Sequence, residues 1–150
     1  MVVKAEGGVA NDDPRQQVAA LPWRMAPLGV EVLLITSRGT KRWVIPKGWP
    51  MRGRAPHEAA QREAFEEAGV KGPVEAEPIG SYRYRKFAKN GSSVVCSVDV
   101  FPLRVMEQKR SWPEKPQRST RWTPAHEAAE LVAEPELRAL ILGFGARVAA

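Results

Sequence analysis

The sequence predicts an α/β domain in which strands, a helix, further strands and closing helices pack in layers. A run of β-branched residues and leucines at Val30–Ile35 is typical of a strand buried on both faces. Alternating side chains at Ile79–Lys86 and Ser93–Phe101, separated by Asn90-Gly91, indicate a hairpin. Near the C-terminus, Glu136–Val148 carries apolar residues at helical spacing.

The remaining elements follow from local signals. Pro56 suits the first turn of a helix and Gly69 suits its end, so we expect a helix over Pro56–Ala68 whose alanines form a small-residue face. We also expect short strands at Val18–Trp23, Trp43–Ile45 and Ser119–Trp122. A loop is expected over residues 106–120, and a helix at Pro124–Ala133. Residues 1–16 are expected to be a flexible N-terminal tail, and residues 17–150 a single domain.

Length and composition set the class of protein. A chain of 150 residues with 43% hydrophobic residues suits one packed domain. No apolar run approaches the roughly 18 residues of a membrane span, and the N-terminus lacks a signal-peptide pattern. The single cysteine, Cys96, lies among valines, which is typical of a buried thiol in a reducing compartment. We therefore expect a cytoplasmic protein without membrane contact; the sequence does not indicate its oligomeric state.

The net charge of +6 is concentrated in one part of the chain. Residues 76–122 contain ten Lys and Arg residues but only four Asp and Glu residues, and the rest of the chain sums to zero. A basic field of this kind favours an anionic partner, such as a phosphorylated metabolite or a nucleic acid. Solubility alone explains the charge equally well.

Three glutamates gather at the C-terminal end of the Pro56–Ala68 helix. Glu63, Glu66 and Glu67 share one helix face, where like charges four residues apart cost roughly 0.2–0.5 kcal/mol. Acids in a last helical turn also oppose the helix dipole, by about 0.3–1 kcal/mol each. A bound Mg²⁺ ion would reverse both penalties. The alternative is a solvated acidic face that pairs with Arg62 and Lys71.

The stretch from Gly48 to Val70 resembles the Nudix box, G-x5-E-x7-R-E-U-x-E-E-x-G-U, in which U is a bulky aliphatic residue. Matching residues are Gly48, Arg62, Glu63, Glu66, Glu67, Gly69 and Val70. Two positions depart from the pattern: Arg54 stands where the family has its first glutamate, and Ala64 is small for its apolar position.

Membership of the Nudix hydrolase superfamily implies an α/β/α sandwich around a mixed sheet. It also implies hydrolysis of a diphosphate bond that depends on Mg²⁺, with Mn²⁺ as an alternative. The resemblance assigns Glu63 and Glu67 as metal ligands, completed by a backbone carbonyl at Gly48. Glu66 is implied as a further ligand or as the general base. Arg62 is implied to orient the acids.

Arg54 leaves an open question about catalysis. In the family, the glutamate at this position often meets the arginine of the box. Either Glu58 takes over as the partner of Arg62, the catalytic geometry is altered, or activity is lost.

Outside the box, the chain looks most similar to the diphosphoinositol polyphosphate phosphohydrolase branch, through Thr36-Ser37-Arg38, Arg42–Pro46 and Arg121-Trp122. That branch cleaves diphosphoinositol polyphosphates and dinucleoside polyphosphates, which require clustered cations. The candidate substrate contacts are Arg15, Arg38, Arg52, Arg54, Arg83, Arg85, Lys86, Arg118 and Arg121. Trp49 suits either a nucleobase stack or a cover over the core.

Three functions remain distinct hypotheses. The first is a pyrophosphohydrolase acting on a polyphosphorylated small molecule, with another nucleoside diphosphate derivative or an RNA 5′ end as alternative substrates. The second is a non-catalytic Nudix module that binds an anion. The third, a nucleic-acid-binding domain using residues 76–122, lacks a recognised motif, so we do not expect nucleic acid as the partner.

Overall fold

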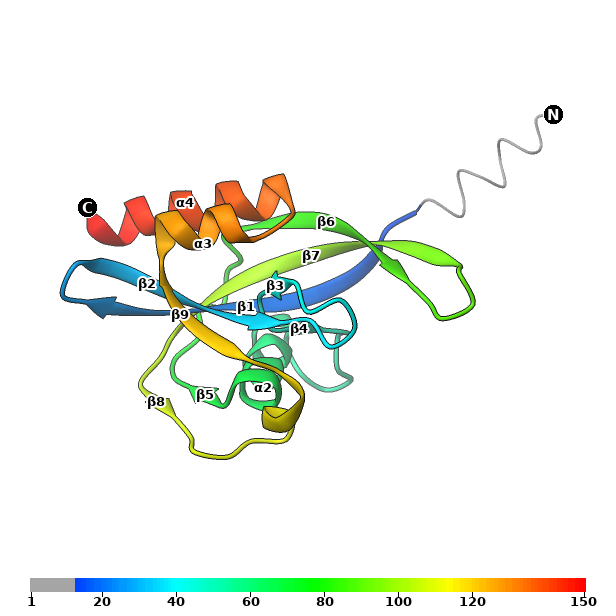
Figure 1. Ribbon diagram of the computed structural model, residues 1–150, viewed down its shortest axis with the longest axis horizontal. Helices are drawn as coiled ribbons and strands as arrows, with labels where there is room; N and C mark the ends of the chain where they lie inside the picture. The colour runs from blue at the N-terminus through cyan, green and yellow to red at the C-terminus, as the bar shows by residue number, and fades with distance from the viewer. Residues whose placement is uncertain (1–12) are drawn as a thin grey trace.

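A mixed β-sheet organises the part of the chain that the structure, a computed structural model, describes, residues 13–150 (Figure 1). Within this part, the sheet has seven strands in the order β3-β2-β1-β7-β6, with β4 paired to β1 and β9 paired to β2. Its strands are β1 (Arg15–Ala26), β2 (Gly29–Thr36), β3 (Trp43–Val44), β4 (Lys47–Gly48), β6 (Gly80–Phe87), β7 (Ser93–Arg104) and β9 (Thr120–Pro124). Strands β1 and β7 run parallel, whereas their other pairings are antiparallel.

Helices cover both faces of the sheet. Figure 1 shows α3 (Ala125–Leu131) and α4 (Pro135–Ala149) together on one side, with α2 (Pro56–Ala68) on the other. A small ladder of β5 (Val70–Lys71) and β8 (Glu107–Gln108) and a short 3₁₀ helix, η1 (Lys115–Gln117), complete the elements. The expected α/β/α arrangement is therefore confirmed. Across residues 13–150, none of the helices combines the length and the apolar character needed to cross a membrane.

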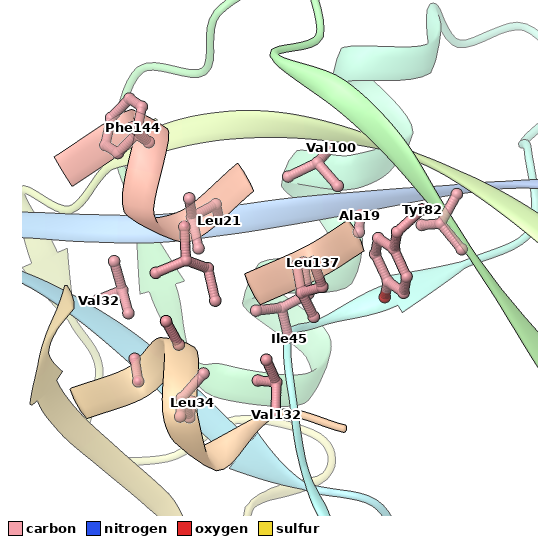
Figure 2. Close-up of a cluster of buried hydrophobic side chains, with 14 of the residues drawn as sticks. Ala19, Leu21, Val32, Leu34, Ile45, Tyr82, Val100, Val132, Leu137 and Phe144 are labelled. Carbon is pink, nitrogen blue, oxygen red and sulfur yellow. The ribbon is translucent and has the colours of Figure 1, made fainter. Parts of the chain in front are cut away.

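Alternating side chains of the central strands supply two separate hydrophobic cores, as expected from the period of two in a strand. On β1, Val18 and Ala20 face α2, whereas Ala19 and Leu21 face α3 and α4. Figure 2 shows the second of these cores, where Leu21 lies near side chains of both closing helices. Both cores are needed because the sheet is buried on two sides.

The structure confirms the predicted order of elements and corrects some of their limits. The helix at Pro56–Ala68 has the predicted bounds. Strand β1 is twice as long as the segment predicted at Val18–Trp23, because its first part pairs with β7 and its last part with β2. Of the expected tail 1–16, residues 1–12 lie outside the described residues, whereas Arg15 and Gln16 belong to β1. The loop expected over 106–120 contains β8 and η1.

Helix α2 is fixed at both ends and along one face. Ala55 offers no side-chain cap, but the Glu58 carboxylate accepts a hydrogen bond of 2.8 Å from the Ala55 backbone N–H. The helix ends where Gly69 adopts a left-handed conformation with φ of 74°. Its fully buried alanines, including Ala60 and Ala64, pack closely against the sheet. This packing fixes the face on which the three glutamates lie.

We expect Ala64→Leu to destabilise the protein by about 1–3 kcal/mol, because Ala64 is fully buried and a larger side chain would overpack the contact of α2 with the sheet. Urea denaturation measures the change in unfolding free energy. The matched control is Ala139→Leu at an exposed position of α4, which should change stability by less than about 0.5 kcal/mol. Equal stability of the two variants would contradict tight packing at Ala64.

Candidate active site

A cleft of about 610 Å³ opens beside the C-terminal half of α2. Its other walls come from the turn after β2, from β4, from β6 and from the loop that precedes β9. Carboxylates lining the cleft are Glu63, Glu66, Glu67 and Glu114, and the cationic lining residues are Arg38, Arg42, Lys47, Arg85, Lys86 and Arg118. The cleft therefore places a cluster of acids beside a larger cluster of bases.

Glu63 and Glu67 form the acidic centre of the cleft. Burial, followed by the charge of Glu67 and a hydrogen bond to it, raises the pKa of Glu63 to about 8. Gly48 makes room for this carboxylate, because a Cβ atom at position 48 would lie 2.2 Å from Glu63 Oε2. Gly48 and the Glu63 carboxylate are thus packed directly against each other.

Glu67 is the most buried of the three helix acids, with a side-chain exposure of 9%. Burial raises its pKa, and the charge of Arg118, whose Nη2 lies 3.5 Å from Glu67 Oε2, opposes that rise. The Lys47 backbone N–H donates a 3.2 Å hydrogen bond to Glu67 Oε1. These contacts hold the Glu67 carboxylate in one orientation.

The loop between β7 and β9 satisfies the carbonyl groups at the end of α2. The Glu66 and Gly69 carbonyls accept hydrogen bonds from the backbone N–H groups of Glu114 and Lys109, at 3.0 and 2.8 Å. Trp112 covers Gly69 so closely that a Cβ atom there would lie 2.2 Å from the indole ring. The same loop brings Glu114 and Arg118 into the cleft, where Arg118 Nε donates to Glu114 at 2.8 Å.

Arg62 pairs with Glu66 and not with Glu58. The Arg62 Nε atom lies 2.7 Å from Glu66 Oε2. The expectation that Glu58 replaces the missing box glutamate as partner of Arg62 is therefore wrong, because the Glu58 carboxylate bonds to the Ala55 N–H. Arg62 nevertheless orients one of the acids that line the cleft.

Lys47 lies on the cationic side of the cleft. Its ammonium group lies 4.9 Å from the ring centroid of Tyr84, whose hydroxyl donates a 2.7 Å hydrogen bond to Gln17. Burial lowers the pKa of Lys47, and the charges of Glu67 and Glu134 oppose that effect. Arg42 is held 3.6 Å from Glu134. Fixed cations of this kind suit an anionic ligand.

The structure brings some predicted site residues together and leaves others apart. All predicted metal-site residues line the cleft, together with Arg38, Arg85, Lys86 and Arg118. Arg118 is 8% exposed and already bonded to Glu114 and the Thr36 carbonyl, so it is mainly a tether within the site. The predicted contacts that do not line the cleft are Arg15, Arg52, Arg54, Arg83 and Arg121.

Several residues of the cleft were not predicted from the sequence. The side chains of Gln17, Arg42 and Tyr84 reach the cleft only because β1, β3 and β6 end near it. The Lys47 side chain had a signal, since it precedes the box glycine. Glu114 had none, because it is an isolated acid in a basic segment.

Residues of the cleft fit a magnesium ion bound with few protein ligands. Within residues 13–150, no three His, Cys, Asp or Glu side chains converge in an arrangement ready to ligate a metal. Glu63 and Glu67 do converge, and burial raises the pKa of both carboxyls, which disfavours two negative charges at this place. Mg²⁺ is suited to such a pair, because it keeps several waters and takes further oxygens from substrate phosphates.

The NUDIX domain family matches residues 14–143. The chain belongs to the Nudix family. Nudix hydrolase 12 of Arabidopsis thaliana, named mitochondrial, is 37% identical over 105 residues, which are 68% of this chain and 52% of that protein. Nudix hydrolase 21 of the same plant, named chloroplastic, is 34% identical over 134 residues, which are 87% of this chain and 66% of that protein. This Nudix chain thus spans between about half and two thirds of these relatives.

Other similarities support the same family and fold. Diphosphoinositol polyphosphate phosphohydrolase 3-beta of Bos taurus is 36% identical over 83 residues, covering 55% of this chain and 46% of that protein. The crystal structure of an Ap4A hydrolase of C. elegans, in a binary complex, aligns with a TM-score of 0.66 at 21% identity. That alignment covers 90% of this chain and 98% of the other, so the Nudix fold is shared almost throughout.

Gly48→Ala should weaken Mg²⁺ binding roughly 10–100-fold, because the added methyl group displaces the Glu63 carboxylate. The increase in melting temperature on titration with Mg²⁺ measures the effect. Gly39→Ala is the matched control, since Gly39 also lines the cleft but a Cβ atom there meets nothing within 4 Å. Equal Mg²⁺ affinity in both variants would show that Gly48 has no such role.

Without divalent cations, the protein should become less stable as the pH rises from about 4.5 to about 8. The folded-state pKa of Glu63, about 8, exceeds its unfolded value of 4.5, so between these values the folded state binds more protons than the unfolded state. Stability is then lost as Glu63 ionises. Thermal melts in EDTA should show this slope, and Glu63→Gln should flatten it; an unchanged slope in that variant would contradict the assignment.

Proposed function

We propose that this Nudix domain hydrolyses a diphosphate bond in a polyphosphorylated small molecule, with Mg²⁺ as cofactor and Mn²⁺ as an alternative. One observation carries the proposal: the neighbouring carboxylates of Glu63 and Glu67 share a cleft with six cationic side chains. Such a cleft offers a place for a cation and a place for the phosphates that the cation would meet.

Each acid has a distinct role in this proposal. Glu63 and Glu67 would hold the cation, with the backbone carbonyl of Gly48, the residue packed against Glu63, as a further ligand. A bound divalent cation would neutralise the diphosphate and lower the pKa of a water molecule. Glu66 lines the cleft and is kept in place by Arg62, which suits a third ligand or the general base that accepts a proton from that water.

The cationic residues support a highly charged substrate. Lys47, Arg85 and Lys86 lie in the cleft outside the acidic centre, where they would bind the phosphates that are not cleaved. Diphosphoinositol polyphosphates and dinucleoside polyphosphates both have this character, and the names of the bovine relative and the nematode structure agree with them. Trp49 and Phe87, exposed aromatic residues of the cleft, would stack on a nucleobase if the substrate is a nucleotide. A cytoplasmic location suits Cys96, which is buried as a free thiol.

A second candidate function is a Nudix module that binds a polyphosphate without cleaving it. The observation that favours it is the pairing of Glu66 with Arg62, which leaves two converging carboxylates instead of three. In this case the cleft would bind the same ligands with no turnover.

One panel separates the two functions. Diphosphoinositol polyphosphates, diadenosine polyphosphates, ADP-ribose, nucleoside triphosphates and 5′-capped or triphosphorylated RNA are each incubated with the protein and Mg²⁺ or Mn²⁺. Release of phosphate or nucleotide supports the hydrolase. Tight binding without turnover across the panel supports the binding module, especially if Arg54→Glu then yields activity. If the panel shows neither turnover nor binding, both proposed functions are refuted.

Glu67→Gln should reduce kcat by about 10³-fold or more, since a lost metal ligand removes several kcal/mol of transition-state stabilisation. The folded structure should persist, because neutralising Glu67 removes a buried charge with a raised pKa. Steady-state kinetics on the best substrate of the panel measure the change. Glu130→Gln, an exposed position of α3, is the control and should retain full activity. Activity of Glu67→Gln within a few-fold of wild type would refute the role.

A further inference from the structure

A second polar groove, of about 300 Å³, lies beside α2 and does not share its lining residues with the catalytic cleft. The side chains that matter in it are Arg54, Glu58, Gln61, Arg62, Phe65 and Lys71. Three of these are cationic and one is anionic. We call this site the Arg54 groove.

The single acid of the Arg54 groove does not neutralise the three cations. The Glu58 carboxylate accepts the hydrogen bond from the Ala55 N–H, and in the described part of the chain no acid lies within 4 Å of Arg54 or Lys71 to form an ion pair. The Lys71 ammonium lies instead over the Phe65 ring, 5.1 Å from its centroid. The groove therefore retains an excess of positive charge.

Arg54 is held at the groove by a tight turn. Its backbone N–H donates a 3.1 Å hydrogen bond to the Met51 carbonyl, and Gly53 between them has φ of 79°. The box pattern would place an acid here to balance Arg62. In this chain a second guanidinium lines the same groove, so the groove holds two like charges and no acid at position 54 to balance them. Like charges gathered in one groove are stabilised when an anion bridges them.

Arg62 has unused hydrogen-bonding capacity toward such an anion. Its Nε atom donates to Glu66, but within residues 13–150 its two terminal nitrogens form no hydrogen bond. The side chain is 50% exposed. A guanidinium offers five N–H donors in a planar fork, which suits the oxygens of a phosphate.

We propose that the Arg54 groove binds a phosphate dianion between the guanidinium groups of Arg54 and Arg62, with Lys71 at its edge. Binding would place the anion on the terminal nitrogens of Arg62, whose Nε atom is bonded to Glu66 of the catalytic cleft. The groove thereby links a phosphate ligand outside the cleft to one of its acids. Binding itself does not depend on the proposed hydrolase activity.

The test is a titration of the full chain with inorganic phosphate in EDTA, followed by ¹H–¹⁵N NMR. Saturable shifts are expected at Gln61, Lys71 and Gly72. Arg54→Glu should weaken the affinity at least about tenfold, and Arg54→Gln, which removes the positive charge without adding a negative one, should weaken it several-fold. Glu66→Gln should strengthen binding by freeing Arg62. The control is Arg52→Glu, which makes the same charge change two residues away at an exposed side chain outside the groove, and its affinity should stay within about twofold of wild type.

Three outcomes would overturn the proposal: no saturable shift at millimolar phosphate, equal weakening by Arg52→Glu and Arg54→Glu, or shifts confined to the cleft residues Arg85 and Lys86. A parallel titration with phenyl phosphate identifies the source of the dianion. Tighter binding of phenyl phosphate assigns the groove to a phosphoryl group of a larger ligand, and tighter binding of inorganic phosphate assigns it to the free ion. Because the titration contains no divalent cation and no turnover is measured, an inactive protein would leave its result unaffected.

Discussion

The like-charge contact between Glu63 and Glu67 is the constraint that the rest of the structure meets. Burial raises the pKa of both carboxyls, and the charge of Glu67 raises the pKa of Glu63 further, so the fold must hold together two acids in a poorly solvated place. The buried alanine face of α2 anchors their helix on the sheet, and Gly48 leaves the space that the Glu63 carboxylate occupies. In the function that we propose, a divalent cation bound between the two carboxylates would remove this repulsion.

Support for this contact comes from segments that are distant in sequence. Strand β4, paired with β1, brings the Lys47 N–H to Glu67, and the loop before β9 brings Arg118 to the same carboxylate. That loop also supplies N–H donors to the last carbonyls of α2, which offsets the electrostatic cost of acids at a helix C-terminus. The site is therefore a product of the whole sheet, although three of its four acids lie within a single helix.

What the sequence predicted well was encoded locally. The bounds of α2 follow from Pro56, Gly69 and the repeated alanines, and the acids of the cleft follow from their spacing on that helix. Strand order is not local, so the sequence could not show which basic side chains reach the cleft. Arg83 and Arg85 are two residues apart on β6 and share one face of the strand, yet only Arg85 lines the cleft. Glu114 arrives on an irregular loop whose path depends on contacts with the end of α2.

The parallel pairing of β1 with β7 has a consequence for biosynthesis. These strands are neighbours in the centre of the sheet but are roughly 80 residues apart in the chain, a separation that slows folding. During translation, β1 and the acidic helix leave the ribosome long before β7 and the loop that carries Arg118. Until then α2 has only a partial sheet to pack on, and its exposed alanine face is open to chaperones. The central pairing of the sheet is therefore completed only after β7 has been synthesised.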